Sequence, residues 1–251
     1  MAALALSLLA LSPVEGLQDE HLQAIRKALD HTATQPYAYQ VKGRFERAGE
    51  WKPDDVLTSR MKQYQSARKG KVILVKGPEG LWKTDEERLG EKVEKPDPDA
   101  ADIVRTLSGA EPPHRIVERL LEEIEKGREP EEREVDGAVC RRYALSYPSA
   151  LLKESLGRQL DKAVATGGLA RPDEVRWSSS LKGSLRIYLS KKEGRLVKAV
   201  EERSVKIAYK VPESQPEVKA YKLEMEIEVL DWDRAAVQLP AEVKNRLGVK
   251  E

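Results

Sequence analysis

The sequence predicts an α+β domain built on antiparallel strands that each have one apolar and one charged face. The clearest sign is segment 221–229, in which Tyr, Leu, Met, Ile and Val alternate with Lys and Glu. Successive side chains of a strand point to opposite faces of the sheet. The alternation recurs in 185–189 and 205–211. Sheets of this kind are usually antiparallel, with one face in water, so helices, the chain itself or a ligand must cover the apolar face.

The first half of the chain is predicted to be a helix, several short strands and two further helices. Apolar residues at helical spacing indicate the first helix at 18–31, and Pro36 ends it. Strands are expected at 37–47, 56–67, 71–76 and 81–83, the last two being joined by the glycine turn at 77–80. The two further helices are expected at 99–107 and 112–126.

The second half is predicted to contain one strand, then a helix, and then three further strands. Asp136-Gly137 is typical of a hairpin turn and leads into a strand at 138–147. A helix begins at Pro148 and ends before the Gly167-Gly168 pair. Strands at 185–189, 196–211 and 221–229 follow, and a short helix comes after Pro240. No composition shift marks a linker, so residues 17–251 are expected to form a single domain.

Residues 1–16 differ in composition from the rest of the chain. Residues 2–11 are small or aliphatic apart from one Ser, a run too short to span a bilayer, which needs about 20 residues. The run fits the apolar part of a secretory signal, although no Lys or Arg precedes it. We expect this segment to derive from a signal peptide and the mature, exported chain to start near residue 17. A buried N-terminal helix of the mature protein is the alternative.

Charge and cysteine content exclude several classes of partner and site. The 44 Lys and Arg residues nearly cancel the 43 Asp and Glu residues, giving a net charge of +1. The sequence therefore gives no electrostatic reason to expect nucleic acid or an acidic membrane surface as a partner. No stretch after the N-terminus is long and apolar enough for an integral membrane protein. The single cysteine, Cys140, excludes an intramolecular disulfide and a four-cysteine zinc site, and its alternating neighbours place it, buried, on a strand.

A search for catalytic motifs gives no candidate. The three histidines, His21, His31 and His114, do not have metalloprotease spacing. No nucleophile elbow, P-loop or dinucleotide fingerprint is present. Acidic residues do gather at 97–102 and 231–233, but acid–base catalysis needs a carboxyl with a raised pKa in a closed pocket. We therefore expect no enzyme, with no catalytic residue, metal or cofactor.

The order of these elements resembles the LolA/LppX-like superfamily of extracytoplasmic lipoprotein carriers and lipid-binding proteins. The matching parts are the first helix with Pro36-Tyr37, the hairpin at 71–82, the segment at 135–143 and the strand pair at 185–198. The resemblance covers most of residues 18–247. The helical middle is longer than in a minimal carrier, and the basic start of a signal peptide is missing.

The resemblance implies an incomplete, strongly curved antiparallel β-barrel, a half-barrel with helices covering its open side. Its hollow would hold lipid or lipoprotein acyl chains, in a monomer that works in the periplasm or after secretion. It also implies an arginine on an early strand that holds the lid closed, for which Arg60 is the nearest candidate.

The predicted site is an apolar cavity between the sheet and the helices at 114–126 and 149–165. Its wall would be Leu185, Ile187, Leu189, Val205, Ile207, Tyr221, Leu223, Met225 and Ile227. Its lid would be Arg60, Ile116, Leu120, Leu121 and Ile124. Binding would be driven by desolvation of the acyl chain. The alternative is a protein–protein interaction or envelope-stress regulatory module that keeps the fold, fills the cavity, exposes an apolar patch and binds an envelope protein partner.

Overall fold

The computed structural model describes most of the chain after the N-terminal segment. The described residues are 19–43, 45–53, 56–90, 106–107, 109–124, 126–165, 174–177, 181–210, 217–230 and 237–249. Several features of the sequence lie outside the described residues. They are the predicted signal-derived segment 1–16, most of the helix expected at 99–107, and the acidic residues at 97–102 and 231–233.

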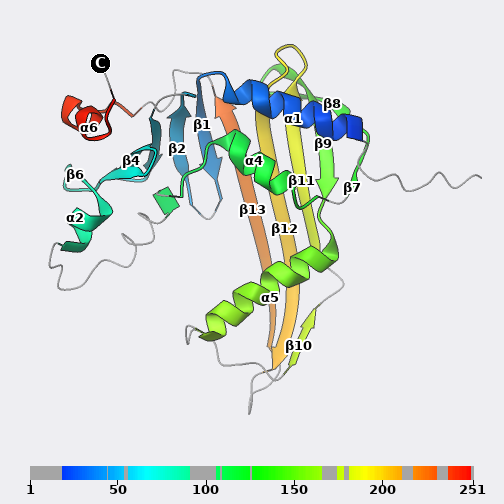
Figure 1. Cartoon of the computed structure of the whole chain (residues 1–251). Helices are drawn as coiled ribbons and strands as arrows, with labels where there is room; N and C mark the ends of the chain where they lie inside the picture. The colour runs from blue at the N-terminus through cyan, green and yellow to red at the C-terminus, as the bar shows by residue number, and fades with distance from the viewer. Residues whose placement is uncertain are drawn as a thin grey trace, which may run out of the picture.

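The described residues form one curled antiparallel sheet that is open rather than closed into a barrel (Figure 1). The strand order is β6-β5-β4-β3-β2-β1-β13-β12-β11-β9-β7, and β10 and β8 pair with β12 and β9. In the first half of the chain lie β1 (Tyr37–Lys42), β2 (Arg47–Trp51), β3 (Leu57–Met61), β4 (Tyr64–Lys69), β5 (Val72–Lys76) and β6 (Trp82–Lys83). In the second lie β7 (Lys126–Gly127), β8 (Glu131–Val135), β9 (Ala138–Ser146), β10 (Glu174–Trp177), β11 (Lys182–Ser190), β12 (Leu196–Lys210) and β13 (Glu217–Leu230).

The described helices lie on both faces of this sheet. They are α1 (Asp19–Ala33), α2 (Asp85–Gly90), α4 (Pro113–Leu121), α5 (Ser149–Ala165) and α6 (Ala241–Arg246). We call the face that α1 and α4 cover the inner face, because their apolar side chains share one core with the central strands. In Figure 1, α5 runs across the lower half of the sheet, in front of β12 and β13, which continue below it, and it contacts β11. The last helix, α6, packs on the outer face of β3 to β5. The structure thus confirms the predicted α+β fold.

The alternating segment that led to the fold prediction lies on β13, at the centre of the sheet. Ile227 points inward and is 1% exposed. On the outer face Glu228 pairs with Lys42 of β1 at 3.1 Å and with Lys198 of β12 at 3.2 Å. The apolar side chains therefore supply the core, and the charged ones join three neighbouring strands on the solvent face.

Two hairpins near the start of the sheet were not predicted. Residues 37–47 were expected to be one strand, but they form β1, a turn and the start of β2. Residues 56–67 were also expected to be one strand, but they contain the β3–β4 turn, where Lys62 adopts φ 50°. That turn contains no Gly, Pro, Asn or Asp, the residues by which such a turn is recognised in a sequence. By contrast, the predicted Asp136-Gly137 turn is confirmed, with φ values of 50° and 79°.

Gly49 on β2 allows two elements of the inner face to approach closely. A Cβ at this position would lie 2.1 Å from the Thr58 carbonyl oxygen and 2.9 Å from the Tyr39 ring. We predict that Gly49→Ala lowers the free energy of unfolding by about 2 to 3 kcal/mol, because β2 and β3 must separate to admit the methyl group. Urea denaturation measures the change. Gly157→Ala is the contrasting variant, because its methyl group would meet no atom within 4 Å. Since Gly157 lies inside α5, this change should raise the free energy of unfolding by up to about 1 kcal/mol.

The only cysteine of the chain is buried, as predicted. Cys140 lies on β9, is 0% exposed and forms no disulfide. Burial, and then the charge of Asp136, raise the pKa of its thiol above the ordinary value. The nucleophilic thiolate form is therefore disfavoured, and slow reaction with thiol reagents stays a prediction.

Candidate ligand-binding face

The predicted wall divides into a packed part and an open part. In the packed part, Leu185 and Ile187 of β11 are both 0% exposed, and they share one core with Leu189 and Ile227. Side chains from α1 and α4 complete this core. The packed part is therefore ordinary protein interior, in which native density leaves no room for an acyl chain.

The predicted lid also packs onto this core. Ile116, Leu120 and Leu121 of α4 are buried in it, and Ile124, just after the helix, is partly exposed. The helix itself is shorter than predicted, ending at Leu121 rather than near residue 126. Any hollow that accepts a ligand must therefore lie beyond the C-terminal end of α4 rather than beneath its middle.

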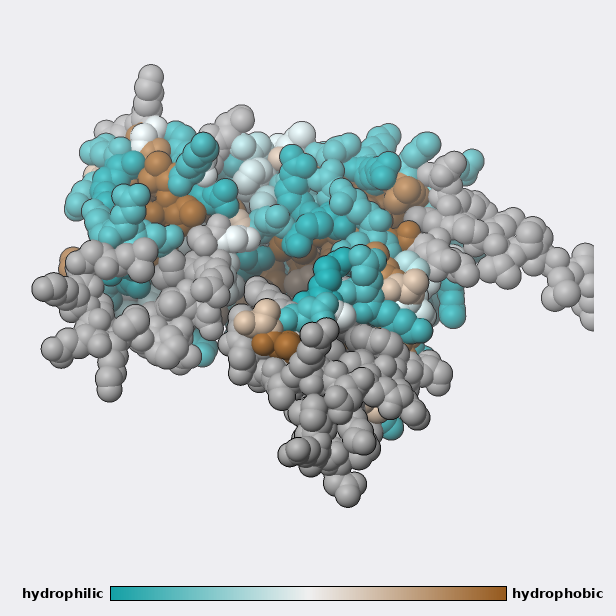
Figure 2. All heavy atoms as spheres, turned by 60° about the horizontal axis from the view of Figure 1, so that its bottom comes forward, coloured by the Kyte–Doolittle hydropathy of each residue, from teal (hydrophilic) through white to brown (hydrophobic). Residues whose placement is uncertain are grey.

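The open part of the inner face lies further along β12 and β13. Leu223 and Met225 of β13 are partly exposed, whereas Val205 of β12 is buried and belongs to the same core as Ile187. Ile207 and Tyr221 lie on the same strands, but their side chains are outside the described part of the chain. Figure 2 views the molecule from the α5 end and shows a hollow near its centre, with brown, apolar atoms at the bottom. This hollow is the best candidate for a ligand-binding site.

A polar cluster that the sequence analysis did not predict lies beside the open part. Arg203 pairs with Leu223 across β12 and β13, and Glu201 pairs with Met225. Residues that are directly opposite in an antiparallel pair point to the same face. Glu201 and Arg203 therefore lie on the inner face, next to the two partly exposed apolar side chains.

Hydrogen bonds and an aromatic contact hold this cluster together. Arg203 donates from Nε to Glu201 Oε1 at 2.6 Å and from Nη2 to Glu123 Oε2 at 3.0 Å. The Tyr147 hydroxyl also donates to Glu201 Oε1, at 3.2 Å. The Arg203 guanidinium lies 4.6 Å from the centroid of the Tyr147 ring, a cation–π distance. Burial, and then the Glu201 charge, raise the pKa of Tyr147, so the phenol remains a donor.

Gly183 of β11 makes space for the ring that covers Arg203. A Cβ at Gly183 would lie 2.8 Å from Tyr147 Cδ2 and 3.1 Å from Leu152 Cδ1 of α5. Gly183 also pairs with Arg203 across β11 and β12. The Tyr147 ring and the first turn of α5 therefore pack over a strand position that has no side chain.

Arg60, the predicted lid arginine, lies away from α4. Its side chain is exposed, and Arg60 pairs with Ala48, which places it on the opposite face from Arg47. Arg47 of β2 is the arginine that lies on the inner face, 6% exposed, with its guanidinium 5.6 Å from the Phe45 ring centroid. Burial lowers the pKa of Arg47, and the Glu111 carboxylate opposes that effect. No pattern in the sequence indicated that Arg47 would be buried.

A buried aromatic group lies at the start of α4. His114 is 6% exposed, and its Nδ1 lies 2.8 Å from the Tyr37 hydroxyl oxygen. The His114 ring also packs against Trp51, with the centroids 5.2 Å apart. Burial, and then the charge of Arg115, lower the pKa of His114 to about 4. From the sequence, His114 was interpreted as a solvated or capping residue at a helix end, so its burial was not predicted.

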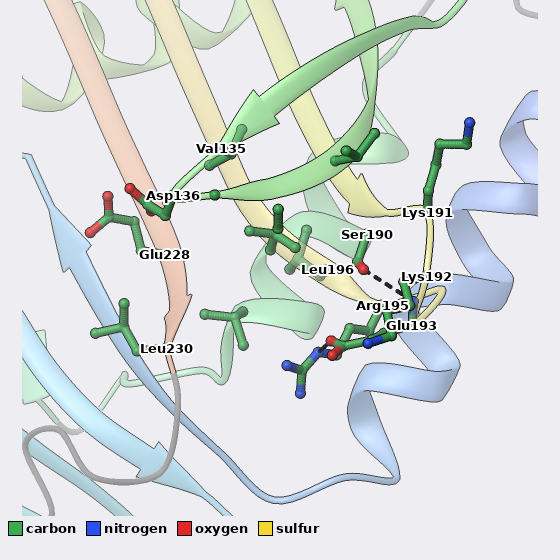
Figure 3. A pocket seen from close by; sticks show the side chains of 15 residues that line it. Val135, Asp136, Ser190, Lys191, Lys192, Glu193, Arg195, Leu196, Glu228 and Leu230 are labelled. Atoms are coloured by element: carbon green, nitrogen blue, oxygen red, sulfur yellow. Dashed lines mark hydrogen bonds and ion pairs between the residues drawn. The ribbon is translucent and has the colours of Figure 1, made fainter.

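A second depression, of about 1020 Å³, lies where the tip of the β8–β9 hairpin faces the ends of β12 and β13 (Figure 3). Its lining is mixed, because Val139, which is 53% exposed, and Leu230 share it with Asp136, Lys192 and Glu228. A third depression, of about 470 Å³, lies beside Ser146 and Ser184. Neither includes a residue of the predicted wall or lid.

The described residues offer no metal site, since no three of their His, Cys, Asp or Glu side chains are grouped as ligands. Within the same residues, no helix has both the length and the apolar character needed to cross a bilayer.

The class of fold that these features define is an open antiparallel sheet with a helix-covered inner face. No family model and no curated protein matches the chain. Among solved structures it is similar to the Mycobacterium tuberculosis lipoprotein LppX, with 12% identity and a TM-score of 0.45 over 89% of this chain and 100% of that one. It is also similar to LprF from Mycobacterium bovis, with 10% identity and a TM-score of 0.43 over 91% of this chain and 100% of that one. Both scores are low, so the functional case rests on this chain's own contacts.

Proposed function

We propose that this chain is an extracytoplasmic carrier that binds a lipid or lipoprotein acyl chain in the hollow beside the open part of the inner face. The observation that carries the proposal is the contrast within one sheet face. Ile187 and Ile227 are packed, whereas Leu223 and Met225 of β13 remain partly exposed. The molecule seen from the α5 end also has a hollow with apolar atoms at its bottom (Figure 2). Exposed apolar side chains in a concave site favour an apolar ligand.

A purified sample that carries ligand gives the most direct test. Protein isolated from its own host should release an acyl lipid on organic extraction, which mass spectrometry identifies. The delipidated protein should bind fatty acyl probes with an affinity that rises with chain length, since each buried CH₂ contributes about 0.8 kcal/mol. An affinity that is independent of chain length would contradict the proposal.

We predict opposite results for two tryptophan substitutions on the inner face. Met225→Trp should reduce binding of a palmitoyl probe at least tenfold, because the indole fills the hollow, and should change unfolding free energy by less than about 1 kcal/mol. Ile187→Trp should instead destabilise the fold by about 1 to 3 kcal/mol, because Ile187 is 0% exposed and the added volume overpacks the core. Calorimetric titration and urea denaturation measure the two effects.

The interaction-module alternative makes a different prediction for the same pair. If the hollow were filled, Met225→Trp would destabilise the protein as much as Ile187→Trp and no lipid would be extracted. The feature that favours this alternative is the second depression, shown in Figure 3, whose lining is partly polar and partly apolar and includes Val139 at 53% exposure. In that case Val139→Asp should weaken binding of an envelope protein partner and leave the fold intact.

A further inference from the structure

The polar cluster of Glu123, Tyr147, Glu201 and Arg203 bears on the kind of acyl ligand that the hollow accepts. The inference drawn from it rests on the proposed function. Glu201 is 4% exposed, so its carboxylate has been removed from water inside an otherwise apolar face. Burial of a charge is costly unless hydrogen bonds and an opposite charge compensate for it. Tyr147 and Arg203 supply both.

Part of the bonding capacity of the cluster remains unused. The guanidinium of Arg203 has its Nε bonded to Glu201 and its Nη2 bonded to Glu123. Neither of these bonds uses Nη1, and the Arg203 side chain keeps 22% exposure. The Glu123 side chain, at 38% exposure, also keeps acceptor capacity. The cluster therefore keeps donor capacity on Arg203 and acceptor capacity on Glu123, on the same face as Leu223 and Met225.

The charge of the cluster selects between possible head groups. Its two carboxylates, Glu123 and Glu201, and its one guanidinium, Arg203, leave a net charge of −1. A free fatty acid or a phosphate head group would add negative charge in a partly desolvated site, where like-charge repulsion is strong. A neutral ester brings no charge, and its carbonyl and hydroxyl oxygens match the unused donor and acceptor.

We propose that the hollow selects acyl chains whose polar group is an uncharged ester with a free hydroxyl, as in an acylglycerol, over free fatty acids. The ester carbonyl accepts a hydrogen bond from Arg203 Nη1, and the hydroxyl donates one to Glu123. The chain extends over Leu223 and Met225, which pair with Arg203 and Glu201 on the same face.

The test compares two probes of equal chain length, 1-monopalmitoylglycerol and palmitate, by calorimetric titration of the delipidated full chain at pH 7.5 below their aggregation concentrations. We expect the glyceride to bind about tenfold more tightly, or more. Equal affinities, or tighter binding of palmitate, would overturn the selectivity while leaving acyl binding intact. Binding of neither probe would overturn the proposed function itself.

A variant isolates the contribution of charge. Glu123→Gln keeps an acceptor oxygen and brings the cluster to zero net charge, so palmitate binding should improve about threefold to tenfold. The preference for the glyceride should shrink by at least that factor, because the neutral amide accepts the glyceride hydroxyl no better than the carboxylate does. Glu122→Gln is the matched control, because Glu122 is exposed and directly precedes Glu123, and it should change neither affinity. A similar gain in both variants would show only a general effect of net charge and would refute the role of the cluster.

Discussion

Arg203→Met should destabilise the protein by about 3 to 5 kcal/mol, the largest effect that we expect from a side chain outside the apolar core. The substitution keeps an apolar stem of similar length but removes the guanidinium that Glu201 faces at 2.6 Å. Glu201, at 4% exposure, would then be a buried carboxylate with one remaining donor, the Tyr147 hydroxyl. Urea denaturation monitored by circular dichroism measures the loss.

The double variant Arg203→Met/Glu201→Gln gives the control for this effect. The double variant leaves no unpaired charge at position 201, and the Gln amide oxygen can still accept a hydrogen bond from Tyr147. It should therefore recover at least half of the stability lost in Arg203→Met. Arg186→Met is a comparison on the outer face, where Arg186 pairs with Glu202 at 2.8 Å and both side chains are about one-third exposed; it should cost less than about 1 kcal/mol. Equal losses in the two single variants would mean that burial of Glu201 is not the cause.

His114 should make the protein lose stability as the pH falls from about 6.5 to about 4. Burial holds the pKa of His114 at about 4 in the folded chain, below the ordinary value of 6.5 that applies to the unfolded chain. The unfolded chain therefore binds more protons than the folded one between these values, and stability rises with pH in that window. The contribution is complete above pH 6.5 and falls by up to about 3 kcal/mol at pH 4.

Comparison of two histidine variants separates this effect from the titration of carboxylates. His114→Gln should flatten the dependence of unfolding free energy on pH between 6.5 and 4. His31→Gln, at an exposed position near the end of α1, should leave the slope unchanged. If both variants keep the wild-type slope, the buried contact between His114 and Tyr37 is not the source of the acid sensitivity.

The alternating strands and the marked turns could be predicted because each depends on residues close together in the sequence. Segment 221–229 gave the faces of β13, and the Asp136-Gly137 turn lies where it was expected. The β3–β4 turn at Lys62 could not be found, because its backbone conformation comes from the pairing of the two strands rather than from a turn-forming residue.

The candidate site was predicted less completely, since facing side chains come from distant parts of the chain. The predicted wall residues lie on β11, β12 and β13, but nothing in the sequence separated packed Ile187 from partly exposed Met225. Glu201 and Arg203 looked like solvent-facing charges, because four charged or polar residues in a row, 201–204, hide the alternation. Only the register with β13 and the contact with Glu123 place them inside.

The pairing of β1 with β13 has a consequence for the order in which the molecule can form. These strands lie side by side at the centre of the sheet, and the ion pair between Lys42 and Glu228 joins residues 186 positions apart. Because the chain is synthesised from its N-terminus, strands β1 to β5 can pair with one another early. Strand β1 can pair with β13 only after residue 230 has been made. Such distant pairing slows folding, so the chain should stay incompletely folded, with the edges of β1 and β12 unpaired, until β13 has been made.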